Sequence, residues 1–158
     1  MRLEIGCGDK PLEGYTHLDC RELPGVDIVD DATTLSKIKN GSCEEIIAIQ
    51  VLEHFSHRDT LNILKLWHSK LAPGGVLHLE VPDLELFCRL WTNDYIKEPW
   101  AFVAIYGSQD YDGNYHKAGF SVRYLTYLLF HAGFLKIENL MADKSNPNCE
   151  IKLRAYKR

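Results

Sequence analysis

Two glycines and an acid near the start of the chain could hold a nucleoside cofactor. The strand-like run at residues 3–5 breaks into Gly6-Cys7-Gly8, and Asp19 stands at the end of the next apolar run. Glycines at the carboxyl end of a strand let a ligand approach bare backbone. An acid at the tip of the neighbouring strand can accept hydrogen bonds from both hydroxyls of a ribose. We therefore expect a nucleoside cradle here; a plain strand-to-turn connection is the alternative.

Strands must position these residues, and the first half of the chain predicts them. Short apolar runs predict strands at residues 2–5, 15–19, 26–29, 45–49 and 76–81. Their hydrophobicity is near-continuous rather than alternating, which is typical of parallel strands covered on both faces. A stripe at helical spacing predicts a core helix before the last of these strands: Leu61, Leu64, Trp67 and Leu71. Pro-Gly-Gly at 73–75 ends it, giving a right-handed crossover.

The connection between the first two strands is unusually short. About ten residues separate Ile5 from Thr16, and they include Pro11 and Gly14. A full crossover helix with its turns takes roughly a dozen residues. We therefore expect this helix to be absent or reduced to one turn. That weakens a dinucleotide reading, because no long helix can present its amino end to a pyrophosphate.

The second half predicts helices followed by two strands. Helices are expected at 83–93, 100–106 and 122–131, with Ser121 as the N-cap of the last. A polar loop with several aromatic residues covers 107–120. Strands at 135–141 and 150–156, separated by a polar turn at 143–148, predict an antiparallel hairpin at the sheet edge.

Composition and charge narrow the class of protein. The 158 residues are 46% hydrophobic and 25% charged, which is ordinary for one globular domain. The formal net charge of −4 argues against a general nucleic-acid binder, which needs a basic face. The five cysteines form no C-x-x-C pair, which favours reduced thiols over disulfides or a zinc site. No leader precedes the first strand, and no apolar run approaches the roughly 18 residues of a membrane span, so we expect a cytoplasmic protein.

The motifs resemble, in order and over nearly the whole chain, those of the class I S-adenosylmethionine-dependent methyltransferases, specifically the small type-11-like group. The segments that carry the resemblance are Leu3-Glu4-Ile5-Gly6-Cys7-Gly8, Gly14-Tyr15-Thr16-His17-Leu18-Asp19, Asp30-Asp31-Ala32-Thr33, Gln50-Val51-Leu52-Glu53-His54, Leu71-Ala72-Pro73-Gly74-Gly75-Val76-Leu77, Val81-Pro82-Asp83 and Asn114-Tyr115-His116-Lys117-Ala118-Gly119-Phe120.

The resemblance implies a fold and a cofactor. It implies one α/β domain over 1–158, a Rossmann-like doubly wound sheet that is mostly parallel with an antiparallel C-terminal hairpin. Residues 1–82 would bind S-adenosylmethionine, with S-adenosylhomocysteine as product, and residues 83–158 would face the acceptor. The cofactor-binding residues that it implies are Gly6, Cys7, Gly8, Asp19, Asp31, Ala32, Gln50, Val51, Leu52 and His54. Asp31 is read equally as an N-cap for a short helix after Thr33.

Three histidines suggest a catalytic or a metal-binding role. His116 lies in the polar loop and is the candidate base for an oxygen nucleophile; a hydrogen-bonded loop histidine is the alternative. An amine nucleophile would need no strong base. Glu53 and His54 with His57 suggest a metal cluster, but they lack the H-E-x-x-H order and matching ligand spacing. We therefore expect no metal.

The acceptor is the least readable part of the sequence. Six aromatic residues follow the fifth strand: Trp91, Tyr95, Trp100, Tyr106, Tyr111 and Tyr115. We expect core packing for most of them; a stacking surface for a sugar or heterocycle is the alternative. The predicted function is methyl transfer to a small or carbohydrate-like acceptor. A non-catalytic S-adenosylmethionine-binding or regulatory module is the alternative, followed by a nucleotide-dependent oxidoreductase. A nucleic-acid partner is not expected, and the sequence does not indicate the oligomeric state.

Overall fold

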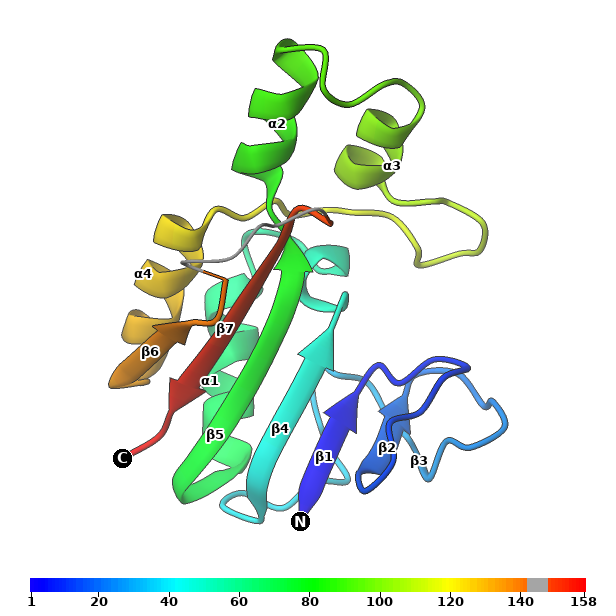
Figure 1. The fold of residues 1–158 in the computed structure, drawn as a ribbon. Helices are drawn as coiled ribbons and strands as arrows, with labels where there is room; N and C mark the ends of the chain where they lie inside the picture. The colour runs from blue at the N-terminus through cyan, green and yellow to red at the C-terminus, as the bar shows by residue number, and fades with distance from the viewer. Residues whose placement is uncertain (142–147) are drawn as a thin grey trace.

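A computed structural model describes residues 1–141 and 148–158 of the chain. Its centre is a seven-stranded sheet in the order β3-β2-β1-β4-β5-β7-β6 (Figure 1). The strands are β1 (Arg2–Ile5), β2 (Thr16–Asp19), β3 (Ile28–Val29), β4 (Cys43–Ile49), β5 (Leu71–Pro82), β6 (Lys136–Asn139) and β7 (Glu150–Tyr156). β1 to β5 are mutually parallel, and β7 runs antiparallel between β5 and β6. The predicted mostly parallel sheet with an antiparallel C-terminal pair is confirmed; most of the predicted turn at 143–148 lies outside the described residues.

The order of the strands creates a cleft between β1 and β4. The chain moves outward from β1 through β2 to β3, then returns to the other side of β1 with β4 and β5. The reversal opens a crevice at the carboxyl ends of these parallel strands, where open α/β sheets bind ligands. The first glycine motif follows β1, and Asp19 ends β2, so both lie at this edge.

Helices α1 (Thr60–Lys70) and α4 (Val122–Ala132) pack against each other behind the sheet as drawn in Figure 1. Three residues of the predicted stripe lie on α1: Leu64 and Trp67 are fully buried in the core and Leu61 packs against it, whereas Leu71 belongs to β5. The Ser121 hydroxyl accepts a hydrogen bond from the Tyr124 amide, which confirms the predicted N-cap of α4. β5 already begins at Leu71, so the Pro-Gly-Gly segment at 73–75, predicted to precede the strand, lies inside it. The register between β4 and β5 shifts at this segment.

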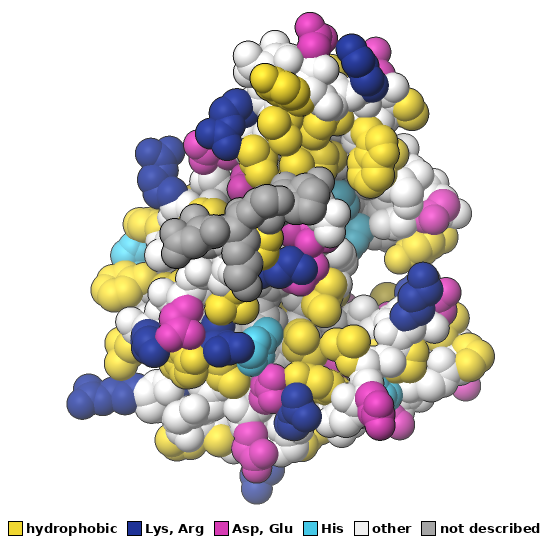
Figure 2. All heavy atoms as spheres, viewed as in Figure 1, with side chains coloured by type: hydrophobic (Ala, Val, Ile, Leu, Met, Phe, Trp, Pro, Cys, Tyr) yellow, Lys and Arg dark blue, Asp and Glu magenta, His cyan; other side chains and the backbone are white. Residues whose placement is uncertain are grey.

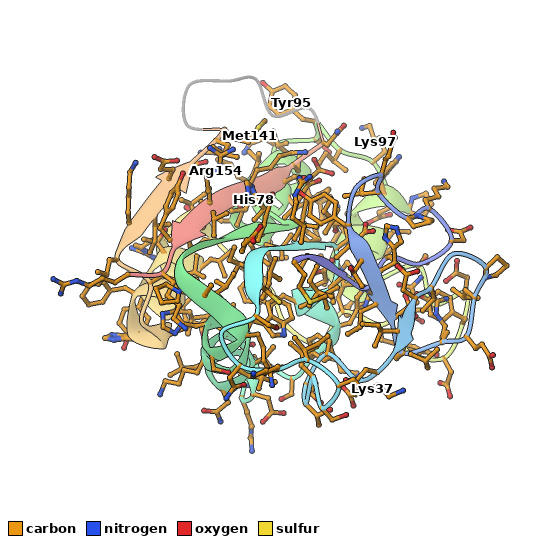
Figure 3. All side chains as sticks on the ribbon, turned by 90° about the horizontal axis from the view of Figure 1, so that it is seen from below. Lys37, His78, Tyr95, Lys97, Met141 and Arg154 are labelled. Atoms are coloured by element: carbon orange, nitrogen blue, oxygen red, sulfur yellow. The ribbon has the colours of Figure 1, made fainter. Side chains whose placement is uncertain are left out.

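The opposite face of the sheet carries no helix among the described residues. The predicted covering of both faces holds for β1, where Leu3, Glu4 and Ile5 are all buried, but β4, β5 and β7 alternate buried with partly exposed residues. β7 alternates buried Ile151 and Leu153 with half-buried Lys152 and Arg154. Arg154 pairs in register with His78 on β5, and both are labelled on this face in Figure 3. Charged side chains are scattered over it in Figure 2. The reason is the predicted short connection: residues 6–15 form turns and no helix.

A second, smaller unit stands beyond the carboxyl edge. Helices α2 (Leu84–Thr92) and α3 (Trp100–Tyr106) rise above the sheet in Figure 1 and share a small cluster with buried Phe87, Ala104 and Cys149. The short 3-10 helix η1 (Leu52–His54) follows β4 in the chain and precedes α1. It lies at the carboxyl end of β4, below α2 and α3 in Figure 1. None of the described helices is long and apolar enough to cross a bilayer.

Candidate active site

A cleft of about 300 Å³ lies at the carboxyl ends of β1, β2 and β4. Seven of the ten residues predicted to bind a cofactor line it: Gly6, Asp19, Asp31, Ala32, Gln50, Val51 and His54. The other three predicted residues do not line it. Cys7 is 7% exposed, Leu52 is fully buried in the core, and the Gly8 amide is already bonded to Asp19. The structure therefore gathers most of the predicted residues around one cavity.

Gly6 brings bare backbone against the start of η1. Its φ is +69°, and a Cβ built on it would lie 2.5 Å from Cγ2 of Val51. Its amide donates to the Leu18 carbonyl at 2.7 Å, which ties the turn after β1 to β2. A side chain here would clash and strain the backbone, so glycine is required by the close approach.

Asp19 is buried and already paired. Its carboxylate accepts hydrogen bonds from the amides of Gly8 and Arg21, both at 2.9 Å, and from Nε of Arg21 at 3.1 Å. Burial alone would raise the pKa of Asp19, but the bonds from Arg21 and Gly8 outweigh it and lower the pKa below its ordinary value. A ribose hydroxyl would therefore have to share this carboxylate with Arg21 or displace it.

Arg21 and Tyr111 are cleft residues that the sequence analysis missed. The Arg21 guanidinium lies 4.5 Å from the centre of the Tyr111 ring, in cation–π geometry. Both line the cleft, so this stack joins the β2 end to the loop after α3. The position of Arg21, two residues after the candidate ribose acid, could have indicated a cleft residue. The contact with Tyr111 could not be predicted, because it depends on tertiary placement.

Asp31 combines the two roles that the sequence left open. Its carboxylate accepts from the Thr33 amide and hydroxyl, both at 2.7 Å, as in a capping turn. The predicted short helix after Thr33 is not formed; the described segment makes turns. Asp31 also lines the cleft beside Ala32, whose carbonyl accepts from Nε1 of Trp67 at 2.9 Å. The core thus holds this loop at the cleft wall.

Gln50 and Cys7 are constrained in different ways. Gln50 ends β4 with φ +54°, an uncommon backbone for a residue other than glycine, and its amide donates to Glu80 O at 2.9 Å. Burial, with the nearby charge of Asp19, raises the pKa of the Cys7 thiol to about 11, so it is not a thiolate nucleophile.

A larger cavity of about 840 Å³ adjoins the cleft under α2 and α3. Tyr95, Trp100 and Tyr111 line it, with exposed fractions of 78%, 67% and 44%. Tyr106 and Tyr115 are exposed too, so the expectation of core packing for most of the six aromatic residues is wrong. The reason is that the α2–α3 pair stands off the sheet and buries only a small cluster of its own. Figure 2 shows apolar side chains gathered over this unit.

His116, the candidate base, lines this second cavity. Its Nδ1 lies 2.9 Å from the Ala104 carbonyl, and burial lowers its pKa, which favours the neutral ring. Its ring stands edge-on to that of His54, with centroids 5.1 Å apart. Burial lowers the pKa of His54 as well, against a hydrogen bond to the Tyr115 carbonyl at 3.2 Å.

Glu53 is the feature of the site that the sequence analysis underrated. Its side chain is 1% exposed and lines the larger cavity, and neither carboxylate oxygen has a hydrogen-bond partner among the described residues. Burial raises its pKa to about 8. His57, the third member of the sequence-based metal cluster, is exposed on the surface. The histidine that folding brings to Glu53 and His54 is His116.

The two cavities meet. Gln50, His54 and Tyr111 line both, so a ligand in the cleft and one in the larger cavity would face each other across these residues. The cleft offers glycine backbone and a buried acid, whereas the larger cavity offers aromatic rings and two neutral imidazoles. The arrangement is suited to a transfer between two bound molecules.

Comparisons with known proteins agree on the fold. No family model matches the chain, and no curated protein sequence matches it. A SAM-dependent methyltransferase of Thermotoga maritima matches 99% of this chain and 81% of its own, at 19% identity and a TM-score of 0.66. One of Archaeoglobus fulgidus matches 98% of this chain and 85% of its own, at 16% identity and a TM-score of 0.63.

A third solved structure holds ligands. It is a 1,6-didemethyltoxoflavin-N1-methyltransferase of Burkholderia thailandensis with 1,6-didemethyltoxoflavin and S-adenosylhomocysteine bound. It matches 98% of this chain and 69% of its own, at 14% identity and a TM-score of 0.64. Together with the strand order and the cleft at the reversal of the sheet, these likenesses show that the chain has the fold of the class I S-adenosylmethionine-dependent methyltransferases.

Proposed function

We propose that this protein transfers a methyl group from S-adenosylmethionine to a small molecule that carries a ring, such as a heterocycle or a sugar. The observation that carries the proposal is the pair of adjoining cavities that share Gln50, His54 and Tyr111. One has the residue types that suit an adenosyl cofactor, and the other is lined by aromatic rings. The fold and the bound ligands of the Burkholderia thailandensis neighbour support this assignment.

The residues of the cleft fit the cofactor. At Gly6, where any Cβ would strike Val51, the backbone alone borders the cavity. Asp19 and Asp31 place carboxylates along the same wall, where hydroxyl and amino groups of a nucleoside can donate. We assign residues 1–82 to cofactor binding and residues 83–158 to the acceptor. Cys7, Gly8 and Leu52 do not line the cleft and would support its wall rather than contact the cofactor.

The geometry suits an in-line displacement. The bound cofactor supplies an electrophilic methyl group on a sulfonium, which passes to a lone pair of the acceptor while the carbon–sulfur bond breaks. The chain has to hold the acceptor in line and keep water away. Tyr95, Trp100 and Tyr111 would stack on the acceptor ring. His116, neutral because it is buried, would accept a proton from an acceptor hydroxyl.

A non-catalytic binding module is the second candidate, and the Asp19–Arg21 pair is the observation that favours it. Donors of Gly8, Cys20 and Arg21 already satisfy the carboxylate that a ribose would use. If Arg21 remains bonded to Asp19, the protein would bind the cofactor weakly or not at all.

Calorimetry followed by a transfer assay tests the proposal. S-adenosylhomocysteine is expected to bind with saturation, and NAD is expected not to bind. Labelled S-adenosylmethionine would then be offered with a panel of heterocycles and sugars, and transfer to one of them is expected. Absence of binding by either form of the cofactor contradicts the proposal. Binding without transfer to any member of the panel favours the non-catalytic module.

A further inference from the structure

Three side chains with metal-binding atoms converge on the wall of the larger cavity. One ligand atom from each of Glu53, His54 and His116 lies within 4.8 Å of the other two. Glu53 and His54 belong to η1, and His116 belongs to the loop before α4. The amides of Lys117 and Ala118 both donate to the Glu53 carbonyl, at 2.8 and 3.1 Å. These bonds fix the loop against η1, so the cluster is built by the backbone and not by a chance approach of side chains.

The carboxylate of Glu53 points to a missing positive partner. Both oxygens are buried, and neither meets a hydrogen-bond donor in the described part of the chain. An unpaired buried carboxylate is costly, and buried charges in proteins are normally paired or bound to a metal. No arginine or lysine of residues 1–141 and 148–158 pairs with Glu53, since the eight ion pairs found there all involve other acids.

Both histidines have a ring nitrogen near a backbone carbonyl. Nδ1 of His54 lies 3.2 Å from the Tyr115 carbonyl, and Nδ1 of His116 lies 2.9 Å from the Ala104 carbonyl. A carbonyl only accepts, so each Nδ1 carries the proton and each Nε2 keeps its lone pair. A hydrogen bond from the second ring nitrogen to a carbonyl is the outer-shell contact that holds metal-binding histidines in place.

We propose that Glu53, His54 and His116 bind a divalent transition-metal ion at the junction of the two cavities. Two imidazoles and one carboxylate suit Zn²⁺, Co²⁺ or Fe²⁺ better than Mg²⁺ or Ca²⁺, which prefer oxygen ligands alone. Three protein ligands leave open coordination positions, and these face the larger cavity that Glu53, His54 and His116 line. The ligand atoms would draw together to about 3.4 Å, the separation of tetrahedral ligands about 2.1 Å from zinc.

The sequence analysis considered Glu53 and His54 together with His57, whereas the structure brings His116 to them. His57 is close in sequence but exposed, and His116 is brought in from a distant loop. The ion would occupy the Nε2 lone pair of His116, so His116 could not act as the proposed base while the ion is bound. Binding of the ion needs neither cofactor nor acceptor. The two proposals can therefore fail separately.

Metal titration of the whole chain tests the site. Protein stripped with a chelator is titrated with Co²⁺, followed by its visible absorption, and with Zn²⁺ in a calorimeter. One equivalent is expected to bind, with Mg²⁺ binding far more weakly. Glu53→Gln and His116→Ala are each expected to weaken binding by at least about 100-fold, more than the loss of an outer-shell partner. His57→Ala is the matched control, an exposed histidine on the same segment, and is expected to bind as the parent does.

The outcomes separate the alternatives. No saturable binding up to about 1 mM Co²⁺, an affinity too weak to matter, overturns the proposal. Binding that survives both substitutions, or that is lost equally in His57→Ala, places the ion elsewhere and overturns it too. If the variants fold poorly, paramagnetic Co²⁺ on the parent gives the answer: it must broaden the ring resonances of His54 and His116 before those of His57. S-adenosylhomocysteine binding by the same samples reports on the proposed function alone.

Discussion

The cofactor cleft and the acceptor cavity are built in opposite ways. In the cleft, Gly6 abuts Val51, and Asp19 is 3% exposed and accepts hydrogen bonds from Gly8, Cys20 and Arg21. In the cavity, Tyr95 and Trp100 are largely exposed on two helices that share only a small buried cluster. The cleft is thus part of the folded core, whereas the cavity wall is an attachment to it. Substitutions in the cleft should lower both cofactor affinity and stability. Substitutions in the cavity wall should change one property and leave the other unchanged.

The largest effect is expected from Gly6→Ala. The new Cβ would meet Cγ2 of Val51 at 2.5 Å on a backbone at φ +69°. Left-handed strain and overpacking together should lower the free energy of unfolding by about 2 to 4 kcal/mol. Because the clash moves the cleft wall, affinity for S-adenosylhomocysteine should fall by at least about 100-fold, close to 3 kcal/mol. Urea unfolding and calorimetry measure the two losses.

Gly41→Ala is the matched control for that prediction. Gly41 has nearly the same backbone, φ +71°, but nothing lies within 4 Å of its added Cβ. The free energy of unfolding should fall only by the cost of the left-handed backbone, about 1 to 2 kcal/mol, and cofactor affinity should not change. Adding Val51→Ala to Gly6→Ala should restore part of the stability, because it removes the clashing methyl groups. Equal losses in the two single variants would show that the contact with Val51 is not what matters.

The second-largest effect is expected at Glu53, on the acceptor side. It is a pH-dependent change in the free energy of unfolding of the metal-free protein. The folded pKa of Glu53 is about 8, raised by burial from an ordinary 4.5. Between these values the folded chain keeps a proton that the unfolded chain has lost, so stability falls as pH rises through this window. Glu53→Gln does not titrate. Its advantage over the parent should therefore grow across the window, to the order of a few kcal/mol at its upper end.

Thermal unfolding with a chelator present, at pH steps across the window, measures this advantage. The parent and Glu53→Gln should converge at the acid end, where both side chains are neutral. Glu44→Gln, at an exposed acid on β4, is the control and should run parallel to the parent. A constant difference between Glu53→Gln and the parent at every pH would mean that Glu53 is not protonated in the fold.

The contrast between the two regions also decides what the sequence could predict. Gly6 and Asp19 were predictable because each satisfies a local demand of backbone or strand end. The N-cap at Ser121 was predictable for the same reason. The convergence of Glu53, His54 and His116 was not predictable, because only the tertiary placement of the loop before α4 brings these residues together. The aromatic residues were misjudged because hydrophobic character does not tell whether a helix has a partner to bury it.

A smaller effect is expected from Asp19→Asn. The Gly8 amide donates to Oδ2 and Arg21 donates to Oδ1, whereas asparagine keeps only one oxygen, so one of these donors would face an NH2 group and the ion pair with Arg21 is lost. Weaker acceptance of the ribose hydroxyls should lower S-adenosylhomocysteine affinity by roughly 10-fold, and stability should fall by about 1 kcal/mol. Asp27→Asn is the control, an acid of the same region that bonds the His17 amide outside the cleft. Calorimetry should find its cofactor affinity unchanged.

Arg21→Ala refines the result for Asp19. If Arg21 competes with the ribose, its removal should raise cofactor affinity or leave it unchanged, although it frees a buried carboxylate. If the stack of Arg21 on Tyr111 instead closes the cleft, its removal should lower affinity. The sign of the change therefore tells whether the pair blocks the cleft or completes it.

The smallest effect on the fold is expected from Trp100→Ala. The side chain is 67% exposed, so stability should change by less than about 0.5 kcal/mol, and cofactor affinity should not change. The acceptor is where the loss should appear: without the stacking ring, KM for a ring-shaped acceptor should rise roughly 3- to 10-fold, with kcat nearly unchanged. Steady-state kinetics at saturating S-adenosylmethionine measure this.

Phe130→Ala controls for the loss of any exposed aromatic ring. Phe130 is 61% exposed on α4 and does not line either cavity. It should leave both KM and cofactor affinity as they are. A rise in KM for Trp100→Ala alone would mean that the α2–α3 unit selects the acceptor while the core carries the cofactor, so the acceptor wall can change without endangering the fold. Loss of cofactor binding in Trp100→Ala would instead show that the two regions are coupled through Tyr111, the ring that both cavities share.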